Sequence, residues 1–326
     1  MSIDVLRPGL LTTVQDLGRH GWRHLGVGCA GALDAFSHRV ANRLVGNPEA
    51  AATLECSLAG PRLRFRHPAR VAVCGALFAL DVDGVAVDGW RPLWLPAGAT
   101  LTIGAARRGA RGYLAVAGGL AVDPVLGSAS TDLRGGFGGI DGRALREGDA
   151  LRVAGATPGT SPEGLRVAPW WIDPAPDLDF EDPANIRMLP GHDAAFAGSA
   201  LLAREWRIAA ASNRQGLRLD GAAIAVDAAA AALSEPVAPG TVQLPPDGRP
   251  IVLLADAQTH GGYARVGHVI RADMPRLAQL RPGGRLRLVP SEPGEARRLA
   301  CAQRQRLARI EHAIADRLGR DDAGCR

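Results

Sequence analysis

The chain of 326 residues contains no lysine, so its 38 strongly basic side chains are all arginine. This absence excludes a biotinyl-lysine, a Schiff-base lysine and a P-loop lysine from the chain. Aromatic residues make up only 4% of the sequence. The net charge is +5, and the arginines are scattered along the chain. Nucleic-acid-binding segments usually combine basic runs with stacking aromatic residues. The composition therefore predicts no nucleic-acid partner.

Cysteines are few, and long apolar runs are missing. The five cysteines form an odd set without a CxxC spacing, which favours reduced thiols over a disulfide framework or a zinc site. No apolar run approaches the length of a membrane span. The N-terminal residues also lack the basic and apolar regions of a secretory signal. We therefore expect a cytoplasmic protein with no membrane partner and no metal site.

Most of the chain reads as short runs of β-forming residues separated by glycine, proline and aspartate. Strand-like runs without a helix after each one favour a sandwich or barrel over a parallel α/β sheet. The runs are 62–66, 70–74, 77–82, 100–103, 112–117, 149–153, 186–189, 206–209, 216–219, 241–244, 251–255 and 285–289.

Helices are few in the predicted structure. Asp34 is placed to cap a short helix whose apolar residues Phe36, Val40 and Leu44 recur every four positions, and a long helix is predicted over about residues 293–318. A proline-rich stretch without alternation separates two β lobes. The predicted organisation is an N-terminal β lobe (1–160), a linker (161–184), a C-terminal β lobe (185–290), and a C-terminal helix with a tail (291–326).

The segment from Pro8 to Asn47 keeps many hydrogen-bonding side chains among glycines. A purely structural stretch would bury a periodic apolar face, so this composition favours a ligand site. The candidate residues are Thr12, Thr13, Gln15, Asp16, Arg19, Asp34, Asn42 and Asn47.

A second polar block follows the apolar run 251–255, at the point where a strand is expected to end. Polar groups beside a glycine pair suit ligand binding, although an ordinary turn is the alternative. The candidates here are Asp256, Gln258, Thr259, Gly261, Gly262 and Tyr263. Arg214 lies in a separate loop, where it could bind a carboxylate or phosphate, or form a structural salt bridge.

Three weaker patterns are interpreted as structural. The glycine-rich loop 134–143 could form an anion nest, but without a strand–GxGxxG–helix context a plain hairpin is favoured. His20 and His24 have no third ligand at a matching spacing. Cys29 lies among small residues, which is typical of packing.

Short motifs recur in a fixed order over about residues 5 to 289. They are residues 8–19, 31–34, 41–47, 54–55, 115–119, 126–131, 139–143, 189–191, 213–216, 239–243, 248–251 and 256–262. The ordered set resembles the KipA family, also called allophanate hydrolase subunit 2 or biotin-dependent carboxyltransferase-like subunits, whose members include the C subunit of 5-oxoprolinase. His260 and Ala264 depart from the family's usual Gln-Thr-Thr-Gly-Gly-Tyr-Pro.

The resemblance implies two cyclophilin-like β-barrel lobes with few helices and a C-terminal helix. It also implies the C subunit of an ATP-dependent 5-oxoprolinase, a hydrolase that opens the lactam 5-oxo-L-proline to L-glutamate. Its implied partners are two further subunits of the complex, one KipI-like and one LamB/YcsF-like. ATP with Mg²⁺ would be used by the complex and not necessarily bound by this chain, which carries no covalent biotin.

The chemistry of the residues suggests roles without assigning each one. Asp16, Asp34 or Asp256 could orient or deprotonate water, and Arg19 or Arg214 could hold the substrate carboxylate. Hydroxyl, amide and backbone donors of the two blocks could stabilise the developing oxyanion. The alternatives are a carboxyltransferase subunit of a biotin-dependent urea carboxylase or allophanate hydrolase-type system, and a KipA-like regulator that sequesters a KipI-like kinase inhibitor. We expect the segment 8–47 and the block 256–263 to converge near a groove shared with the KipI-like partner.

Overall fold

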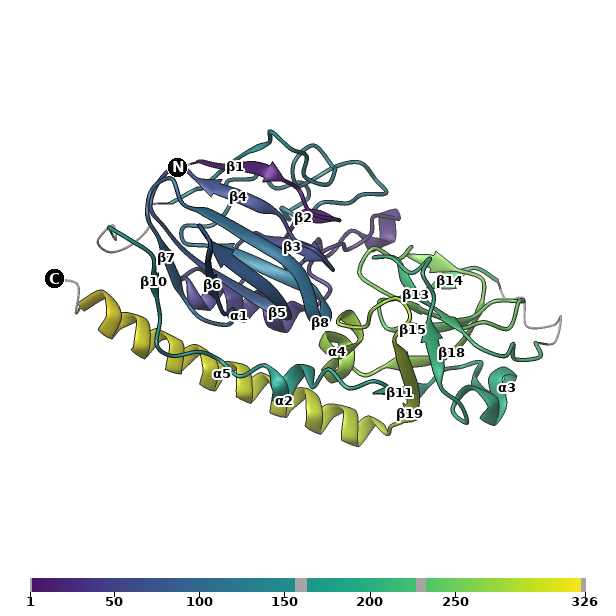
Figure 1. Cartoon of the computed structure of the whole chain (residues 1–326). Helices are drawn as coiled ribbons and strands as arrows, with labels where there is room; N and C mark the ends of the chain where they lie inside the picture. Colours follow the sequence, from purple (N-terminus) through teal and green to yellow (C-terminus); the bar gives the residue numbers. More distant parts are fainter. Residues whose placement is uncertain (1, 156–162, 227–232, 324–326) are drawn as a thin grey trace. The chain divides into compact units, whose positions relative to one another are not determined.

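The computed structural model describes residues 2–155, 163–226 and 233–323, and the chain folds into two compact units (Figure 1). Unit 1 comprises residues 1–18, 34–176 and 305–326, and unit 2 comprises 19–33 and 177–304. The boundary after residue 176 falls inside the predicted linker. The segment 19–33, predicted in the first lobe, belongs to unit 2, because its Leu33 packs in the apolar core of that unit.

Unit 1 is built on a ten-stranded sheet whose main order is β10-β7-β5-β8-β4-β1-β9. β2 and β3 join this path through β8, and β6 pairs with β5. The strands are β1 (Ser2–Arg7), β2 (Thr12–Gln15), β3 (Thr53–Ser57), β4 (Arg62–Phe65), β5 (Ala69–Val82), β6 (Val85–Val87), β7 (Leu93–Leu95), β8 (Thr100–Val116), β9 (Ala150–Arg152) and β10 (Arg166–Val167).

The helix α1 (Ala35–Leu44) lies against β5 and β8 of this sheet (Figure 1). Its Phe36, Val40 and Leu44 are buried, and the Asp34 carboxylate accepts a hydrogen bond from the Ser37 backbone N at 2.9 Å. A side-chain acceptor at this position satisfies one of the helix's free N–H groups. The predicted helix and its cap are therefore confirmed.

Unit 2 is a closed barrel of seven strands in the order β11-β18-β15-β16-β13-β12-β19. Its strands are β11 (Ala184–Pro190), β12 (Trp206–Ile208), β13 (Gly216–Asp220), β15 (Thr241–Leu244), β16 (Ile251–Leu253), β18 (Ala264–Val269) and β19 (Arg285–Pro290). The strands β14 (Glu235–Pro236) and β17 (His260–Gly261) form a separate two-stranded ladder. Apolar side chains such as Ile186, Trp206 and Val252 fill the core of the unit.

The remaining helices are short, except for the last one. They are η1 (Arg23–Leu25), α2 (Ala175–Leu178), α3 (Ala194–Ala197), η2 (Gly198–Leu201), η4 (Arg271–Asp273), α4 (Met274–Ala278) and α5 (Pro293–Ala323). The first part of α5 belongs to unit 2 and the part from Gln305 onwards to unit 1. In the described ranges, no helix is both long and apolar enough to cross a membrane.

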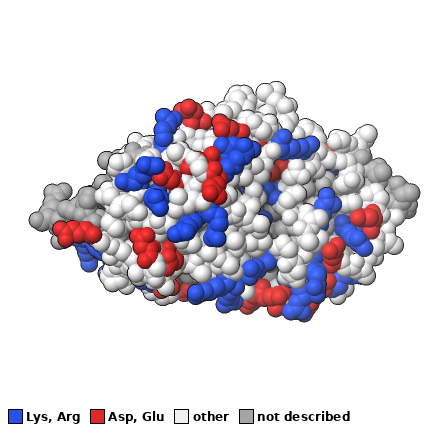
Figure 2. Space-filling model, turned by 45° about the horizontal axis from the view of Figure 1, so that its top comes forward, with Lys and Arg blue, Asp and Glu red and all other residues white. Residues whose placement is uncertain are grey.

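The mainly-β prediction is confirmed, and each predicted run overlaps a strand. Two pairs of predicted runs merge, because β5 and β8 continue through bulges between Gly75 and Leu80. Strand pairing closes unit 2 into a barrel, whereas the main strand path of unit 1 ends at β10 and β9 among the described strands. On the face shown in Figure 2, arginine and acidic residues are interspersed, as the scattered charge of the sequence suggests.

Candidate functional site

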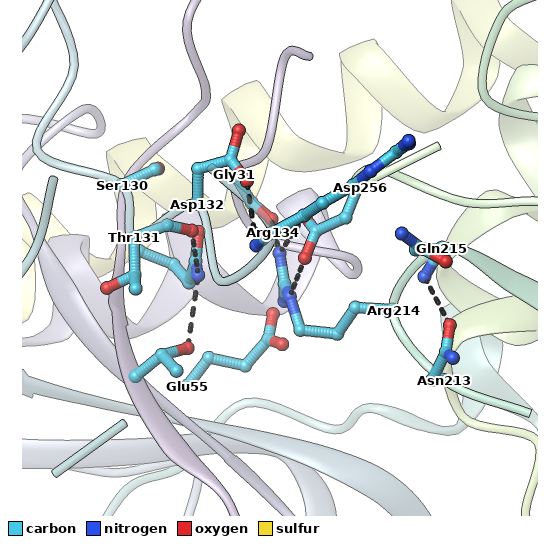
Figure 3. Close-up of polar contacts among 12 residues, drawn as sticks. Gly31, Glu55, Ser130, Thr131, Asp132, Arg134, Asn213, Arg214, Gln215 and Asp256 are labelled. Carbon is cyan, nitrogen blue, oxygen red and sulfur yellow. Dashed lines mark hydrogen bonds and ion pairs between the residues drawn. The ribbon is translucent and has the colours of Figure 1, made fainter. Parts of the chain in front are cut away.

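In unit 2, Arg214 and Asp256 form a buried, bidentate ion pair (Figure 3). Nε of Arg214 lies 2.8 Å from Oδ2 of Asp256 and its Nη2 lies 2.9 Å from Oδ1, and the two side chains are 3% and 6% exposed. Nη2 also donates to the carbonyl of Gly31 at 2.7 Å. Because a guanidinium fork fits a carboxylate in this geometry, the pair is a strong one.

The backbone holds both partners of this pair in place. Asp256 follows β16, and its N–H donates to the Arg214 carbonyl at 3.1 Å, while Leu254 N donates to the Gln215 carbonyl at 2.9 Å. The preceding loop is tightened by a hydrogen bond of 2.8 Å from Gln215 N to Oδ1 of Asn213 (Figure 3). The sequence left Arg214 open as a ligand-binding or structural residue, and the structure pairs it with a second predicted residue.

The turn after Asp256 carries the rest of the second block. Its Gly261 pairs with Glu235 between β17 and β14, and Thr259 accepts a hydrogen bond of 3.0 Å at its carbonyl from Val237 N. Tyr263 is 45% exposed. The turn is therefore anchored at one side and open to solvent at the other.

Gly261 leaves room for a buried glutamine amide. A Cβ at Gly261 would lie only 2.6 Å from Nε2 of Gln243 and 3.5 Å from Nε2 of Gln258. Gln243 is 1% exposed, and its Nε2 has no hydrogen-bond partner among the residues that the structure describes. A buried donor without a partner destabilises a fold, so its retention favours a functional reason. Sequence reasoning missed Gln243 as a site residue, because it reads as an ordinary strand position.

In unit 1, Asp16 lies in a cradle of neutral donors. Its carboxylate accepts hydrogen bonds from the Ser128 and Ser130 hydroxyls, both at 2.6 Å, and from the backbone N of Gly18 at 2.8 Å and Ala129 at 2.7 Å. Burial alone would raise the pKa of Asp16, but these hydrogen bonds together hold it below its ordinary value. The carboxylate is ionised at neutral pH, and its acceptor positions are largely occupied.

Asp34 belongs to a second buried network, around Tyr113 of β8. The Tyr113 hydroxyl donates to Glu55 at 2.8 Å and accepts from Asp34 N at 2.7 Å, while the Ser37 hydroxyl donates to the Asp34 carboxylate at 2.6 Å. Burial, and then the nearby Glu55 carboxylate, raise the pKa of Tyr113. Tyr113 is therefore a neutral donor to the Glu55 carboxylate of β3, and its oxygen accepts the backbone N–H of Asp34 at the start of α1.

The two predicted asparagines bracket the end of α1. Asn42 donates to the Ala51 carbonyl at 2.8 Å and accepts from Asn47 Nδ2 at 3.2 Å. Asn47 in turn donates to the Val116 carbonyl at 2.8 Å and accepts from Gly118 N at 2.9 Å. Both side chains are buried, so these contacts fix local structure.

The hydroxyl and amide residues of β2 are also buried and paired. The Thr12 hydroxyl donates to the Pro8 carbonyl at 2.6 Å. Gln15 Nε2 donates to the Thr13 hydroxyl at 3.0 Å and to the Thr131 carbonyl at 3.2 Å. Arg19 is fully buried in unit 2, where its backbone N donates to the Cys29 carbonyl at 2.7 Å.

The predicted site residues thus fall in both units. Unit 1 holds Thr12, Thr13, Gln15, Asp16, Asp34, Asn42 and Asn47, and unit 2 holds Arg19, Arg214, Asp256, Gln258, Thr259, Gly261, Gly262 and Tyr263. Inside unit 2, the Gly31 carbonyl of the opening segment contacts Arg214, the ion-pair partner of Asp256. Convergence of the other residues stays a prediction.

The hydrogen-bond partners of Asp16 and Asp34 and of their networks were not among the predicted site residues. Ser128 and Ser130 lie in a conspicuous Ser-Ala-Ser motif, and Glu55 and Tyr113 interrupt apolar strands directly opposite each other. Charged or phenolic groups at buried strand positions are the signal that could have revealed them.

The weaker sequence patterns give no catalytic constellation. In the glycine-rich loop, Oδ1 of Asp132 already accepts hydrogen bonds from the backbone N of Arg134 and Gly135, at 3.1 and 2.8 Å. A cavity of about 410 Å³ is lined by part of this loop together with Asp123 and Arg152. No group of three histidine, cysteine or acidic residues suited to a metal ion occurs within the described ranges.

Comparisons with known proteins identify the family. The model of the family "Carboxyltransferase domain, subdomain A and B" matches residues 25–290. The chain is 40% identical over 300 residues to the C subunit of 5-oxoprolinase from Escherichia coli (strain K12), covering 90% of this chain and 93% of the relative. It is 36% identical over 301 residues to the C subunit of 5-oxoprolinase from Haemophilus influenzae, covering 91% and 94%.

A solved structure agrees with this assignment. The Kluyveromyces lactis urea carboxylase superposes with a TM-score of 0.84 at 28% identity, covering 96% of this chain. The chain spans 29% of that longer solved chain. The matched length, the sequence identity and the fold all agree, and this chain belongs to the family of the carboxyltransferase domain, subdomain A and B.

Proposed function

We propose that the chain is the C subunit of an ATP-dependent 5-oxoprolinase complex, in which it helps hydrolyse 5-oxo-L-proline to L-glutamate. The observation that carries this proposal is the likeness to the C subunits of two 5-oxoprolinases over nearly the whole length of both chains. The other members of the complex would be a KipI-like subunit together with a LamB/YcsF-like one, and the complex would be cytoplasmic.

The substrate explains why the complex would use ATP. A five-membered lactam is a resonance-stabilised amide, and ATP can supply the driving force by phosphorylating the lactam oxygen, which releases ADP and makes the ring carbon a better electrophile. Water then adds to the ring carbon, and the carbon–nitrogen bond breaks as the nitrogen takes up a proton and becomes the amine. The acyl phosphate that this leaves is hydrolysed by a second water to the carboxylate and inorganic phosphate. ATP with Mg²⁺ belongs to the complex in this proposal and is not assigned to this chain, which has no P-loop lysine.

The Arg214–Asp256 pair is the best candidate for holding the substrate carboxylate. Arg214 already binds one carboxylate bidentately, so a carboxylate of the substrate has the right shape to replace or extend that contact. Asp256, once displaced from the guanidinium, would become a carboxylate available to orient water.

The turn beside this pair offers neutral donors for a developing oxyanion. Gln258 is part-exposed, and next to Gly261 lies Nε2 of Gln243, which has no hydrogen-bond partner in the described part of the chain. Amide donors that are held in place stabilise the negative charge on the oxygen in the transition state more than they stabilise the neutral oxygen of the ground state. Thr259 and the backbone of Gly261 and Gly262 would complete this surface.

Asp16 and Asp34 are less suited to proton transfer, since both are engaged by donors of their own unit. We propose that they, with Thr12, Thr13, Gln15, Asn42 and Asn47, position the polar interior of unit 1. A contribution of Arg19 to carboxylate binding remains part of the proposal.

The test is co-expression of this chain with the KipI-like and LamB/YcsF-like subunits, followed by an assay of ADP and glutamate formation with and without 5-oxoproline. We expect 5-oxoproline to stimulate ADP release in step with glutamate. A purified complex of the three proteins without this stimulation would contradict the proposal.

The second candidate is a carboxyltransferase subunit of a urea carboxylase, which the likeness to the Kluyveromyces lactis structure favours. Since the chain has no lysine, a separate biotinylated carrier would have to be supplied. Urea-dependent consumption of carboxybiotin by the complex, without any effect of 5-oxoproline, would select this reading. Binding to a KipI-like protein with no turnover by the complex would select the regulator.

A further inference from the structure

Unit 1 contains a cavity that the proposed chemistry does not use. It encloses about 430 Å³ beside β5, between the loop 88–91, two arginines of β8 and the segment 171–174. We call it the tryptophan pocket and define it by Phe78, Trp90, Arg91, Arg107, Arg108 and Trp171. Its volume is that of a small ligand or one or two large side chains.

The apolar wall of the tryptophan pocket is preformed. Trp90 is 3% exposed, and its indole N–H donates to the Gly75 carbonyl at 3.1 Å, while its backbone N donates to the Val73 carbonyl at 2.8 Å. The Trp90 carbonyl accepts from Ile172 N at 2.9 Å, which ties the segment carrying Trp171 to the same wall. An incoming apolar group would therefore find its surface already ordered.

Trp171 leaves a large apolar surface in water. Its side chain is 54% exposed, although it lines a cavity with Phe78 and Leu80. A half-exposed tryptophan at the edge of an apolar cavity is typical of an interaction site, because tryptophan is enriched among the residues that dominate binding energy.

The lining of the pocket carries an excess of positive charge. Arg91, Arg107 and Arg108 contribute three guanidinium groups against the single carboxylate of Asp88. Arg91 lies 3.9 Å from Asp88, which is 86% exposed, so that ion pair neutralises little. The charges complement an acidic partner.

We propose that the tryptophan pocket is a docking site for the KipI-like subunit, from which it receives a bulky apolar side chain flanked by carboxylates. The proposal rests on the proposed function, in which this chain works only within a complex. Aromatic residues and arginine are the types enriched where proteins bind one another, and the arginines select an acidic segment.

The test measures the affinity of the full chain for the purified KipI-like subunit by calorimetry. We expect Trp171→Ala to weaken binding at least about tenfold, as loss of a central aromatic residue does. Phe196→Ala is the matched control, because Phe196 is a 39% exposed aromatic residue of unit 2, and it should bind like the wild type.

Charge reversal gives an independent readout that does not alter the apolar wall. Arg107→Glu combined with Arg108→Glu should weaken binding and reduce its dependence on salt, whereas Arg64→Glu, at an exposed position of β4, should change neither. Wild-type affinity for Trp171→Ala and for the double reversal would overturn the proposal.

A second experiment distinguishes binding of a small ligand in the tryptophan pocket from docking of a protein partner. Quenching of tryptophan emission by indole-3-acetate, together with unchanged affinity of Trp171→Ala for the KipI-like subunit, would assign the pocket to a small carboxylate and overturn docking. The proposed function fails differently, through a wild-type complex that assembles but forms no ADP in response to 5-oxoproline.

Discussion

Two buried carboxylates, one in each unit, are stabilised in different ways. Asp16 of unit 1 is held by neutral hydroxyl and backbone donors, and Asp256 of unit 2 by the charged guanidinium of Arg214. The Asp16 cradle is spread over several groups, so no single ligand could replace it. The guanidinium of Arg214 is one group, and another carboxylate could take the place of Asp256.

The neutral cradle stabilises an ionised carboxylate inside the fold, which is a structural role. In the proposed function, by contrast, Arg214 exchanges the Asp256 carboxylate for the carboxylate of the substrate. The comparison predicts that the Asp16 cradle responds to substitution through stability, and the Arg214–Asp256 pair through both stability and substrate binding.

The largest effect is expected from breaking the ion pair. Arg214→Met leaves the Asp256 carboxylate buried without its charged partner, so the free energy of unfolding should fall by about 3–5 kcal/mol. Urea unfolding followed by circular dichroism measures this change.

The double variant Arg214→Met with Asp256→Leu is the matched control. Because it removes both charges, it should recover most of the lost stability while abolishing activity of the complex. A double variant as unstable as Arg214→Met would show that the pair is not the cause.

A lower pH should reduce the free energy of unfolding through the buried His38 of unit 1. Burial lowers the pKa of His38 from 6.5 to about 4, so the unfolded chain binds a proton that the folded chain does not. The contribution of His38 to the free energy of unfolding is therefore fully present above pH 6.5. It is lost as the pH falls to 4, by about 3 kcal/mol in total.

His38→Gln isolates this contribution. The variant should lose much of the slope between pH 6.5 and 4 in urea unfolding, and the slope that stays includes His268 of unit 2, whose pKa burial also lowers. An unchanged slope in His38→Gln would contradict the assignment.

A smaller loss is expected from the Asp16 cradle. Asp16→Asn replaces one acceptor oxygen by an NH₂ group that faces donors, which should cost about 2 kcal/mol in the free energy of unfolding. Ser130→Ala removes one donor and should cost about 1 kcal/mol. If Asp16→Asn were as stable as the wild type but inactive, Asp16 would belong to the chemistry and the contrast between the units would fail.

A stability effect no larger than that of Ser130→Ala is expected at the turn of unit 2. Gly261→Ala places a Cβ 2.6 Å from Nε2 of Gln243, and the amide must shift, at a cost of about 1 kcal/mol. Activity of the complex should fall much more than stability, at least about tenfold. Gly294→Ala, whose Cβ would meet only the flexible end of Arg298 at 3.8 Å, is the control and should leave activity unchanged. Equal activity of the two variants would remove the Gln243 amide from the proposed site.

Local patterns in the sequence predicted much of the fold. The Asp34 cap and α1 depend on residues within one helix, and alternating burial such as that of β4 is visible in the sequence itself. The full lengths of β5 and β8 were not predictable, because Gly75 and the bulges after it interrupt the alternation.

The site was harder to predict, because its contacts are distant in sequence. Arg214 and Asp256 are 42 residues apart, and both were recognised without being paired. The segment 19–33 belongs to unit 2 because Leu33 packs in the core of that unit. Tertiary packing of this kind leaves no local pattern in the sequence. Gln243 was missed because two tertiary features single it out: its Nε2 has no hydrogen-bond partner among the described residues, and Gly261 lies next to it.

The most direct test of the central claim compares the KipI-like and LamB/YcsF-like subunits with and without this chain. ADP and glutamate are measured over time with 5-oxoproline and ATP present. The account predicts coupled formation of both products only when this chain is present, and loss of that coupling in the stable double variant of Arg214 and Asp256. Product formation by the other two subunits alone at the same rate, or full activity of the double variant, would contradict it.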